Sequence, residues 1–359
     1  MAFENRYGFL DRVLHKIAFF SWTAQAALSD FENTLFAERL SSIDVKRPVF
    51  ITALPRAGTT LLLELCNTID EFTSHSYRNM PFVLTPLLWN RFSQSFQSND
   101  KERERAHGDG MMVGIDSPEA FEEIVWRTFW RSNYKKGHIE AWAGQRDRDF
   151  EHFLRDHIRK IIVLSASNNI ATIRYISKNN LNISRVNYLR KIFPDSITVI
   201  LYRDPIAHAS SLLQQHQNFL KIHADDKFAK SYMQAIGHYD FGRTLKPVNF
   251  SNWLNDTPYK ATNSLSFWLA YWCACYGYLA ATASSHALFL SYDRLIANPV
   301  EGLRLLAEKI GIEQSELFIE QASRFRQPRS YETDTEEIPS ELLLQVQQVF
   351  EDITTRSTF

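Results

Sequence analysis

The sequence predicts an α/β fold in which a central parallel β-sheet is flanked by helices. Short apolar runs of strand type alternate with helical patterns, and basic residues stand where several of these runs end. Strands of a parallel sheet are buried on both faces, so they read as continuous apolar runs joined by crossover helices. Their carboxyl ends meet at one edge, where such sheets bind ligands. We therefore expect a ligand site at that edge.

The first strand and the helix after it enclose the most informative loop. Residues 49–54 form an apolar run that predicts a buried strand, and the leucine-rich residues 61–65 begin a helix. Between them lies Pro55-Arg56-Ala57-Gly58-Thr59-Thr60. The N–H groups and the dipole at a helix start attract anions, and a glycine lets the backbone turn sharply. This stretch predicts an anion-binding loop.

The loop differs from the nucleotide phosphate loop G-x-x-x-x-G-K-[ST]. When Gly58 is aligned with the second glycine of that motif, Ala53 replaces the first glycine and Thr59 replaces the lysine. The cation is instead Arg56, which predicts a relative of the phosphate loop with different chemistry. An ordinary strand–helix turn with a surface arginine also fits this hexapeptide taken alone.

Two further strands are followed by cations. Residues 173–177 precede Lys178, and residues 197–202 precede Arg203. Together with Arg56, these residues place three cations at one edge of the sheet, which indicates a ligand site more strongly than any single motif. The other predicted elements are a strand at 287–292 and helices at 81–92, 149–165, 184–193, 206–220, 267–279 and 300–310, the last ending at Gly311, with a further helix that Ser117 caps and Pro118 begins.

We expect an N-terminal helical segment at residues 1–46 and a single α/β domain at 47–359. In the first segment, apolar residues recur at helical spacing, namely Leu10, Val13, Leu14, Ile17 and Phe20. The domain carries insertions at about 80–150 and 221–262. The second insertion contains two glycines and two prolines and predicts a loop-rich lid over the site.

Composition excludes several classes of protein. A net charge of −1 argues against a general binder of nucleic acids or membrane surfaces, because such proteins carry a basic excess. Cys66, Cys273 and Cys275 show neither zinc spacing nor a disulfide framework, which predicts buried thiols in a reducing compartment. The first residues lack a signal pattern, and the apolar window 13–28 is too short and too polar to span a bilayer. We expect a cytoplasmic protein without a transmembrane segment.

Two motifs together resemble those of the sulfotransferases that use 3′-phosphoadenosine-5′-phosphosulfate (PAPS), in their bacterial and Golgi-like branch. The stretch Pro55–Thr60 resembles the family's 5′-phosphosulfate loop. Arg203, with Ser211 eight residues further on, resembles its 3′-phosphate motif. Residues 177–180 and 291–295 are also similar to family sequences, so the resemblance covers roughly residues 47–312.

The resemblance implies a three-layer sandwich of the P-loop-containing nucleotide hydrolase-like type. It implies transfer of a sulfuryl group from PAPS to a hydroxyl or amine, with 3′-phosphoadenosine-5′-phosphate (PAP) as product and no metal. Arg56 would bind the phosphosulfate and stabilise the leaving group, and Lys178 would balance charge on the sulfuryl group or contact the acceptor. The implied cofactor-binding residues are Arg56, Ala57, Gly58, Thr59, Thr60, Arg203, Ser211 and Tyr292, the last at the adenine pocket.

An acceptor oxygen needs a general base. Family members use a histidine or glutamate soon after the first helix, and His75 lies at that position. The intrinsic pKa of histidine suits the task, although a structural histidine is an alternative interpretation. The other candidate bases are His107, Asp116, Glu119 and Glu122.

Two other functions stay open at this point. A small-molecule kinase is disfavoured because Thr59 replaces the lysine and no carboxylate evidently follows a strand to hold Mg²⁺. A nucleotide-binding protein that has lost catalysis is the other alternative. The acceptor is open as well: a carbohydrate, a lipid headgroup or a hydroxylated small molecule fits the aromatic, mixed-charge insertions. A basic segment with Arg324, Arg326 and Arg329 could close over a phosphate.

Overall fold

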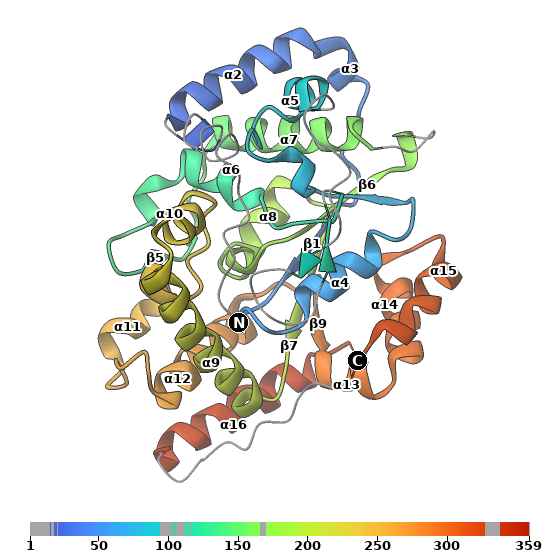
Figure 1. The fold of residues 1–359 in the computed structure, drawn as a ribbon. Helices are drawn as coiled ribbons and strands as arrows, with labels where there is room; N and C mark the ends of the chain where they lie inside the picture. Colours follow the sequence, from blue (N-terminus) through green and yellow to red (C-terminus); the bar gives the residue numbers. More distant parts are fainter. Residues whose placement is uncertain are drawn as a thin grey trace.

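Five parallel strands form the central sheet (Figure 1). The computed structural model describes residues 15, 18–19, 21–93, 103–104, 112–114, 116–165, 170–326 and 338–358. The strand order is β2-β6-β1-β7-β9, and every neighbouring pair is parallel. The strands are β1 (Val49–Thr52), β2 (Phe72–Thr73), β6 (Arg174–Lys178), β7 (Ile197–Tyr202) and β9 (Ala287–Ser291). The predicted parallel α/β class is confirmed.

The strand order brings three loops together at one edge. After β1 the chain runs to the edge strand β2 and returns through β6, which pairs with one side of β1. It then crosses to β7, on the other side of β1, and continues to β9. The connections reverse direction at β1, and ligands of open parallel sheets bind outside the carboxyl ends of the strands at such a point.

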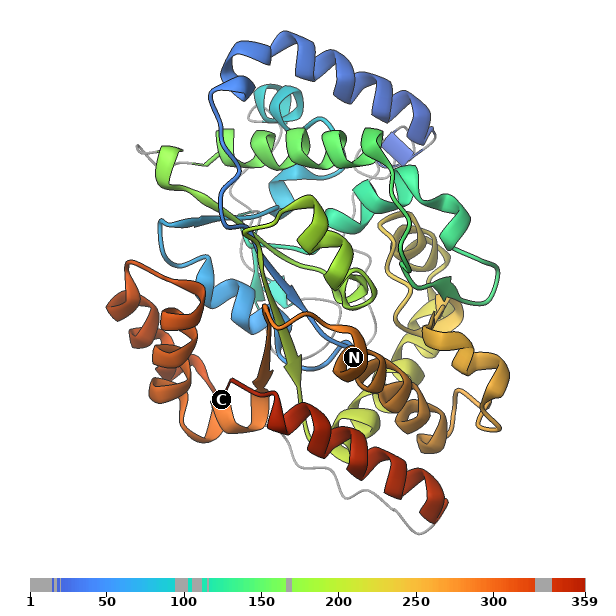
Figure 2. The same ribbon diagram turned by 180° about the vertical axis from the view of Figure 1, so that it is seen from behind.

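Helices cover both faces of the sheet (Figures 1 and 2). They are α2 (Trp22–Leu35), α3 (Ala37–Ser41), α4 (Thr59–Cys66), α5 (Pro86–Ser93), α6 (Glu122–Phe129), α7 (Arg148–Val163), α8 (Val186–Ile192), α9 (Pro205–Asp225), α10 (Lys227–Ala235), α11 (Trp253–Asp256), α12 (Leu265–Thr282), α13 (Tyr292–Ala297), α14 (Pro299–Ile310), α15 (Ser315–Glu320) and α16 (Ser340–Thr355). Because side chains alternate along a strand, Phe50 packs in the core formed with α6–α9, α12 and α16, whereas Val49 and Ile51 pack with α4, α14 and α15.

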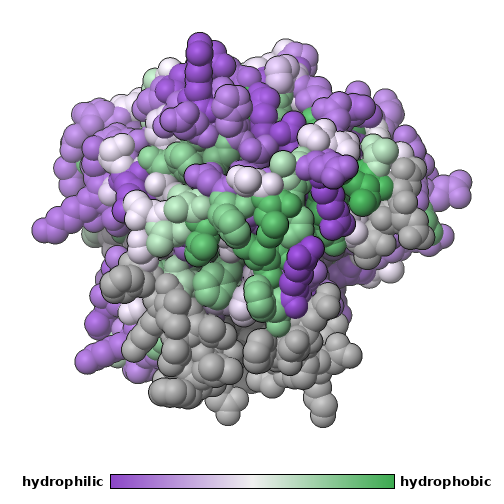
Figure 3. Space-filling view, turned by 90° about the horizontal axis from the view of Figure 1, so that it is seen from above, coloured by the Kyte–Doolittle hydropathy of each residue, from purple (hydrophilic) through white to green (hydrophobic). Residues whose placement is uncertain are grey.

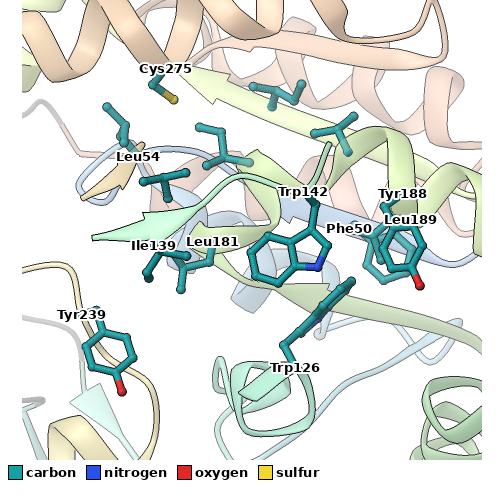
Figure 4. Packing of buried hydrophobic residues seen from close by; sticks show 14 of the residues in the cluster. Phe50, Leu54, Trp126, Ile139, Trp142, Leu181, Tyr188, Leu189, Tyr239 and Cys275 are labelled. Atoms are coloured by element: carbon teal, nitrogen blue, oxygen red, sulfur yellow. The ribbon is translucent and has the colours of Figure 1, made fainter. Parts of the chain in front are cut away.

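The larger core is aromatic and contains a buried cation. The rings of Trp126 and Trp142 meet edge to face, with centroids 5.7 Å apart (Figure 4). The guanidinium of Arg185 lies 4.2 Å from the first ring centroid and 4.0 Å from the second. Its Nη1 and Nη2 donate to the carboxylate of Glu123 at 2.7 and 3.0 Å. The charge is therefore both paired and stacked, as a buried arginine requires.

The predicted helix start at Ser117 is wrong. Helix α6 begins at Glu122, and the Ser117 hydroxyl instead accepts a hydrogen bond from the N–H of Gly114 at 2.9 Å. The segment is held extended because Pro118 forms a bridge with Ser76 and the N–H of Glu119 donates to the carbonyl of His75. A tertiary contact thus overrides the local capping pattern.

The insertion at 221–262 is more helical than predicted. Helix α9 continues to Asp225, and α10 follows directly. The two insertions are joined, because β5 (Ile139–Glu140) pairs in parallel with β8 (Val248–Asn249). Helix α16 was not predicted from the sequence. Residues 1–14, 16, 17 and 20, which include the apolar residues of the predicted N-terminal helix, lie outside the described residues.

Helix α2 leaves an apolar stripe on the surface. Leu28, Phe31 and Leu35 are exposed along it, and Phe92 is exposed on α5. The view from above shows hydrophobic surface in the middle of this face, with hydrophilic residues above it and at its sides (Figure 3). No described helix combines the length and apolarity needed to cross a membrane. The three cysteines are free thiols within α4 and α12, and burial raises the pKa of Cys273 to about 12.

Removing the partner of the buried arginine should destabilise the fold. In Glu123→Ala, Arg185 keeps its burial and loses its counter-ion, so we expect a loss of about 3–5 kcal/mol in the free energy of unfolding. Urea unfolding followed by circular dichroism measures it. Glu301→Ala is the control, because its partner Arg304 is exposed and such pairs contribute about 0–1 kcal/mol. Equal losses in the two variants would contradict this account.

Candidate functional site

The loop after β1 has an unusual backbone. Gly58 precedes α4 in the left-handed region with a φ of +88°, and Arg56 also has a positive φ of +70°. A positive φ is uncommon for residues other than glycine and is often found at binding sites. The N–H of Leu62 bonds to the carbonyl of Gly58 at 3.1 Å, so the helical hydrogen bonds of α4 begin directly at this glycine.

Two side chains from the next strand–helix unit hold the carbonyl groups of this loop. His208 Nε2 donates to the carbonyl of Pro55 at 2.7 Å, and Arg203 Nη1 donates to the carbonyl of Arg56 at 3.1 Å. In a trans peptide the C=O and the N–H point in opposite directions. The N–H groups of Arg56 and Ala57 are therefore turned away from α9. The loop presents fixed donors because its acceptors are already occupied.

The His208 imidazole is a neutral donor. The residue is completely buried, and burial, with the charge of nearby Arg203, lowers its pKa to about 3. Because Nε2 lies 2.7 Å from a carbonyl oxygen, that nitrogen carries the proton. His208 thus fixes the loop without adding a charge that titrates near neutral pH.

Arg203 keeps donor capacity for a ligand. Its Nε is buried and makes no hydrogen bond within the described structure. The carboxylate of Asp293 lies 3.7 Å from it, beyond hydrogen-bond distance. The side chain of the neighbouring Asp204 caps α9 by accepting from the N–H of Ala207 at 2.8 Å. A buried cation with an unused N–H is suited to a phosphate.

Tyr292 closes one side of the loop. It follows β9, and its ring lies directly against Gly58: a Cβ at that glycine would be 2.2 Å from the ring. The Arg203 guanidinium carbon is 5.6 Å from the ring centroid. Burial raises the pKa of the phenol, and the positive charges of Arg203 and Arg56 oppose this shift. Glycine is therefore required at position 58 both for its φ and for its lack of a side chain.

Lys178 ends β6, next to the strand that leads into the loop. Its Cα is paired with that of Ile51 in the sheet register. The two residues after it are held in place, since Asn179 Nδ2 donates to Glu123 at 2.8 Å and Asn180 Nδ2 donates to Asp240 at 3.0 Å. The strand order thus brings Arg56, Lys178 and Arg203 to one edge of the sheet, and their roles in binding and catalysis stay predictions.

The remaining loop and helix residues lie as follows. Thr59 and Thr60 are buried in the first turn of α4, and Ala57 is buried in the smaller core. Ser211 is half-buried on α9, two turns after the Asp204 cap. Their predicted phosphate contacts stay predictions as well.

His75 lies in the protein interior. It is 1% exposed, its Nε2 is 2.8 Å from Nε2 of His157, and its Nδ1 is 3.2 Å from the hydroxyl of Tyr175. That hydroxyl donates to Glu122 at 3.0 Å, so Nδ1 of His75 carries a proton. Burial lowers the pKa of His75 to about 3. Both ring nitrogens are therefore engaged, and this network would have to open before His75 could meet a substrate; its role as base stays a prediction.

The other candidate bases are mostly committed to protein partners. Glu122 is completely buried and accepts from the side chains of Trp126, Tyr175, Ser177 and Asn182. Asp116 forms a two-point ion pair with Arg78 at 2.7 and 2.9 Å. Glu119 is half-buried and accepts from the Tyr77 hydroxyl at 2.5 Å. His107 lies outside the described residues.

Comparison with known proteins identifies the family. The model of the sulfotransferase family matches residues 48–245, which is more than half of the 359-residue chain. The chain belongs to the sulfotransferase family. The matched region begins at β1 and includes the loop, Lys178, Arg203 and α9. No protein among the curated sequences matches this sulfotransferase.

Solved sulfotransferase structures resemble it at low identity. STF1 from Mycobacterium tuberculosis is 17% identical, with a TM-score of 0.46, over 91% of this chain and 81% of that protein. STF9 from Mycobacterium avium is 14% identical, with a TM-score of 0.49, over 90% and 80%. A sulfotransferase from Alicyclobacillus acidocaldarius is 12% identical, with a TM-score of 0.34, over 87% and 94%. Because these TM-scores are below 0.5, the family assignment depends on the sequence match.

The structure of this sulfotransferase shows two features that the sequence interpretation missed. His208 lies on the face of α9 that meets the loop, and a histidine–carboxylate pair, His238 and Asp240, lies near Lys178. The sequence held one indication of the second, because the glycines Gly237 and Gly242 frame it. In the structure both have positive φ. For the basic segment, Arg324 pairs with Glu64 of α4 at 3.0 Å, and Arg329 lies outside the described residues. Among the described residues no group of three or more metal-binding side chains occurs.

Adding a methyl group at Gly58 should disrupt the loop. Gly58→Ala imposes both the cost of a positive φ and a clash with the Tyr292 ring, whereas Gly144→Ala, with a φ of +81° and open space around it, imposes only the first. We expect Gly144→Ala to cost about 1–2 kcal/mol of unfolding free energy and Gly58→Ala at least about 1 kcal/mol more. Thermal unfolding compares them. Equal costs would show that the ring does not restrict position 58.

Proposed function

We propose that this sulfotransferase transfers a sulfuryl group from PAPS to a hydroxyl or amine of an acceptor. The observation that carries the proposal is the arrangement of donors at the sheet edge. His208 and Arg203 donate hydrogen bonds to the carbonyl groups of Pro55 and Arg56, so the N–H groups of these peptides would face a bound anion. Arg203 also has a buried Nε–H that would bind a second anion. PAPS has two anionic ends, a 5′-phosphosulfate and a 3′-phosphate.

The residues present fit this donor molecule. The loop N–H groups, the hydroxyls of Thr59 and Thr60 and the guanidinium of Arg56 would hold the phosphosulfate, because helix starts and guanidinium groups bind such oxygens. Arg203 and Ser211 would hold the 3′-phosphate. Tyr292, packed between Gly58 and Arg203, would border the adenine. A phosphate at Arg203 would satisfy an N–H that otherwise costs desolvation energy.

Catalysis in this proposal is mainly positioning and charge stabilisation. As in phosphoryl transfer, negative charge develops on the leaving oxygen and spreads over the oxygens of the transferred group. Arg56 would stabilise the leaving phosphate, and Lys178, from the adjacent strand, would balance the sulfuryl charge. No metal is part of the proposal. The acceptor class stays as the sequence left it: carbohydrate, lipid headgroup or hydroxylated small molecule.

Calorimetric titration with PAP, and separately with ATP and Mg²⁺, tests the proposed donor. We expect micromolar binding of PAP and none of ATP, because the loop lacks the lysine that reaches the β- and γ-phosphates. Binding of ATP with Mg²⁺ instead would favour a kinase. Binding of PAP without transfer from labelled PAPS to any acceptor would favour a protein that has lost catalysis.

Removing the Arg203 side chain should weaken PAP binding. Arg203→Ala loses a charged contact to a buried phosphate and also frees the carbonyl of Arg56, so we expect a loss of about 2–4 kcal/mol in binding free energy. Arg304→Ala, which removes an exposed arginine on α14, is the control and should leave the dissociation constant unchanged. An unchanged constant for Arg203→Ala, measured by the same titration, would remove Arg203 from the site.

Removing the Arg56 side chain should abolish transfer. The backbone of the loop is held through its carbonyl groups, so Arg56→Ala should keep the fold, as measured by circular dichroism and thermal unfolding. The rate of transfer from labelled PAPS should fall below detection because the leaving phosphate loses its stabilising charge. Turnover at the wild-type rate would refute the role of Arg56.

A further inference from the structure

A histidine–carboxylate pair lies in the segment between α10 and the short helix η5 (Gly242–Thr244). Nε2 of His238 is 3.8 Å from Oδ2 of Asp240. The His238 backbone is anchored, since its N–H donates to the carbonyl of Met233 at 2.9 Å. Its ring stacks on Phe219 of α9, with centroids 5.3 Å apart. The imidazole therefore has a fixed position and a nearby negative charge.

Helix α9 holds this segment in the same way that it holds the anion-binding loop. Nδ1 of His216 accepts from the N–H of Gly242, and Nδ1 of His223 accepts from the N–H of Arg243, both at 3.1 Å. On the other side, a Cβ at Gly237 would be 2.6 Å from the side chain of Glu123. The helix that begins beside Arg203 thus also positions the His238–Asp240 pair, about three to five turns further along.

Hydrogen bonds connect the pair to the edge of the sheet. Oδ2 of Asp240 accepts from Asn180 Nδ2 at 3.0 Å, and the carbonyl of Asn180 accepts from the hydroxyl of Thr52 at 3.2 Å. Thr52 is the last residue of β1, three positions before the anion-binding loop, and Asn180 follows Lys178 by two residues. Hydrogen bonds through Asn180 therefore connect the pair to the carboxyl ends of β1 and β6, close to Lys178.

His238 differs from the other histidines of this region in its access to solvent. His75, His157, His208, His216 and His223 are buried, whereas His238 and Asp240 are half-buried, with 16% and 14% of their side-chain surface exposed. Four charged or titratable groups act on the imidazole: Asp240, Glu119, Lys178 and His223. Burial lowers the pKa of His238, and the charge of Lys178 adds to this, while the two carboxylates oppose it. The ring is therefore neutral near pH 7 and is able to take up a proton.

We propose that His238, paired with Asp240, accepts the proton of the acceptor hydroxyl during sulfuryl transfer. The neutral ring carries its own proton on Nδ1, so Nε2 has the free lone pair. As the acceptor oxygen forms its bond to sulfur, its proton moves to Nε2 of His238. The bond between sulfur and the bridging phosphate oxygen breaks, and that oxygen keeps the electron pair. Asp240 stabilises the imidazolium, which then loses its proton to solvent. This inference rests on the proposed function, and it replaces His75 as the base.

The decisive variants are His238→Asn and Asp240→Asn. His138→Asn is the matched control, because His138 is also a partly exposed histidine beside a carboxylate, Glu140, but belongs to the β5 region. His75→Asn tests the competing base. For each protein, calorimetry gives PAP affinity, and labelled PAPS gives transfer to phenol, to 4-nitrophenol and to water across a range of pH.

We expect His238→Asn to bind PAP within twofold of wild type and to transfer to phenol about 10²–10⁴-fold more slowly. Transfer to 4-nitrophenol, which unlike phenol is substantially ionised near neutral pH and so needs a base less, should fall much less. Wild-type activity should rise as pH increases through the pKa of His238, since only the neutral ring accepts a proton. Asp240→Asn should move this rise to lower pH, because the carboxylate raises that pKa, and His238→Asn should abolish it.

Failure of this inference is distinct from failure of the proposed function. If wild type does not bind PAP, the proposed function fails. If PAP binds, the role of His238 is overturned when His238→Asn transfers at the wild-type rate, or when its transfer rate falls equally for phenol and 4-nitrophenol. It is also overturned when only His75→Asn has a reduced transfer rate. If wild type binds PAP but transfers to none of the three acceptors, the proposal is overturned when NMR titration shows that Asp240→Asn leaves the pKa of His238 unchanged.

Discussion

The orientation of two peptide groups, those that join Pro55 to Arg56 and Arg56 to Ala57, is the constraint on which the site depends. Their carbonyls are held by His208 and Arg203, so their N–H groups are turned away from α9. The strand that leads to Arg203 is itself held in place. The hydroxyl of Tyr276 on α12 donates to the carbonyl of Leu201, near the end of β7, at 2.8 Å. The backbone of this loop therefore depends on residues of the adjacent strand and helix as well as on the left-handed conformation of Gly58.

A second constraint is the pair of buried carboxylates Glu122 and Glu123, which accept hydrogen bonds from residues on both sides of Lys178 in the sequence. Glu122 receives four hydrogen bonds, and Glu123 receives those of Arg185, Tyr134 and Asn179. Such networks contribute little net stability compared with an apolar core of the same shape, but breaking one partner is costly. Their effect here is positional, since they fix the residues of β6 and the turn after it. The His75–His157 contact belongs to this network, which explains why a histidine near the first helix is buried.

Local pattern was sufficient for the parts of the site that belong to one strand–loop–helix unit. The strand at 197–202 and the cation after it were predicted correctly, because an apolar run and its end are properties of consecutive residues. The helix start predicted at Ser117 and the loop-rich structure predicted for residues 221–262 were wrong for the opposite reason. Ser117 is held by the strand segment at Ser76, and residues 236–244 are held by α9, so partners distant in sequence decided their conformation.

The sequence by itself determined the α/β class, the loop between β1 and α4 and the three cations that follow strands. Apolar runs and helix starts are patterns of neighbouring residues, so they can be identified without tertiary contacts. Only the tertiary structure decided the surroundings of each histidine. His75, His208 and His238 look alike in the sequence, yet one is buried in a polar network, one holds a loop carbonyl and one stays partly exposed beside a carboxylate. Their protonation and access depend on burial and on charges from other strands and helices, and the order of the strands sets both.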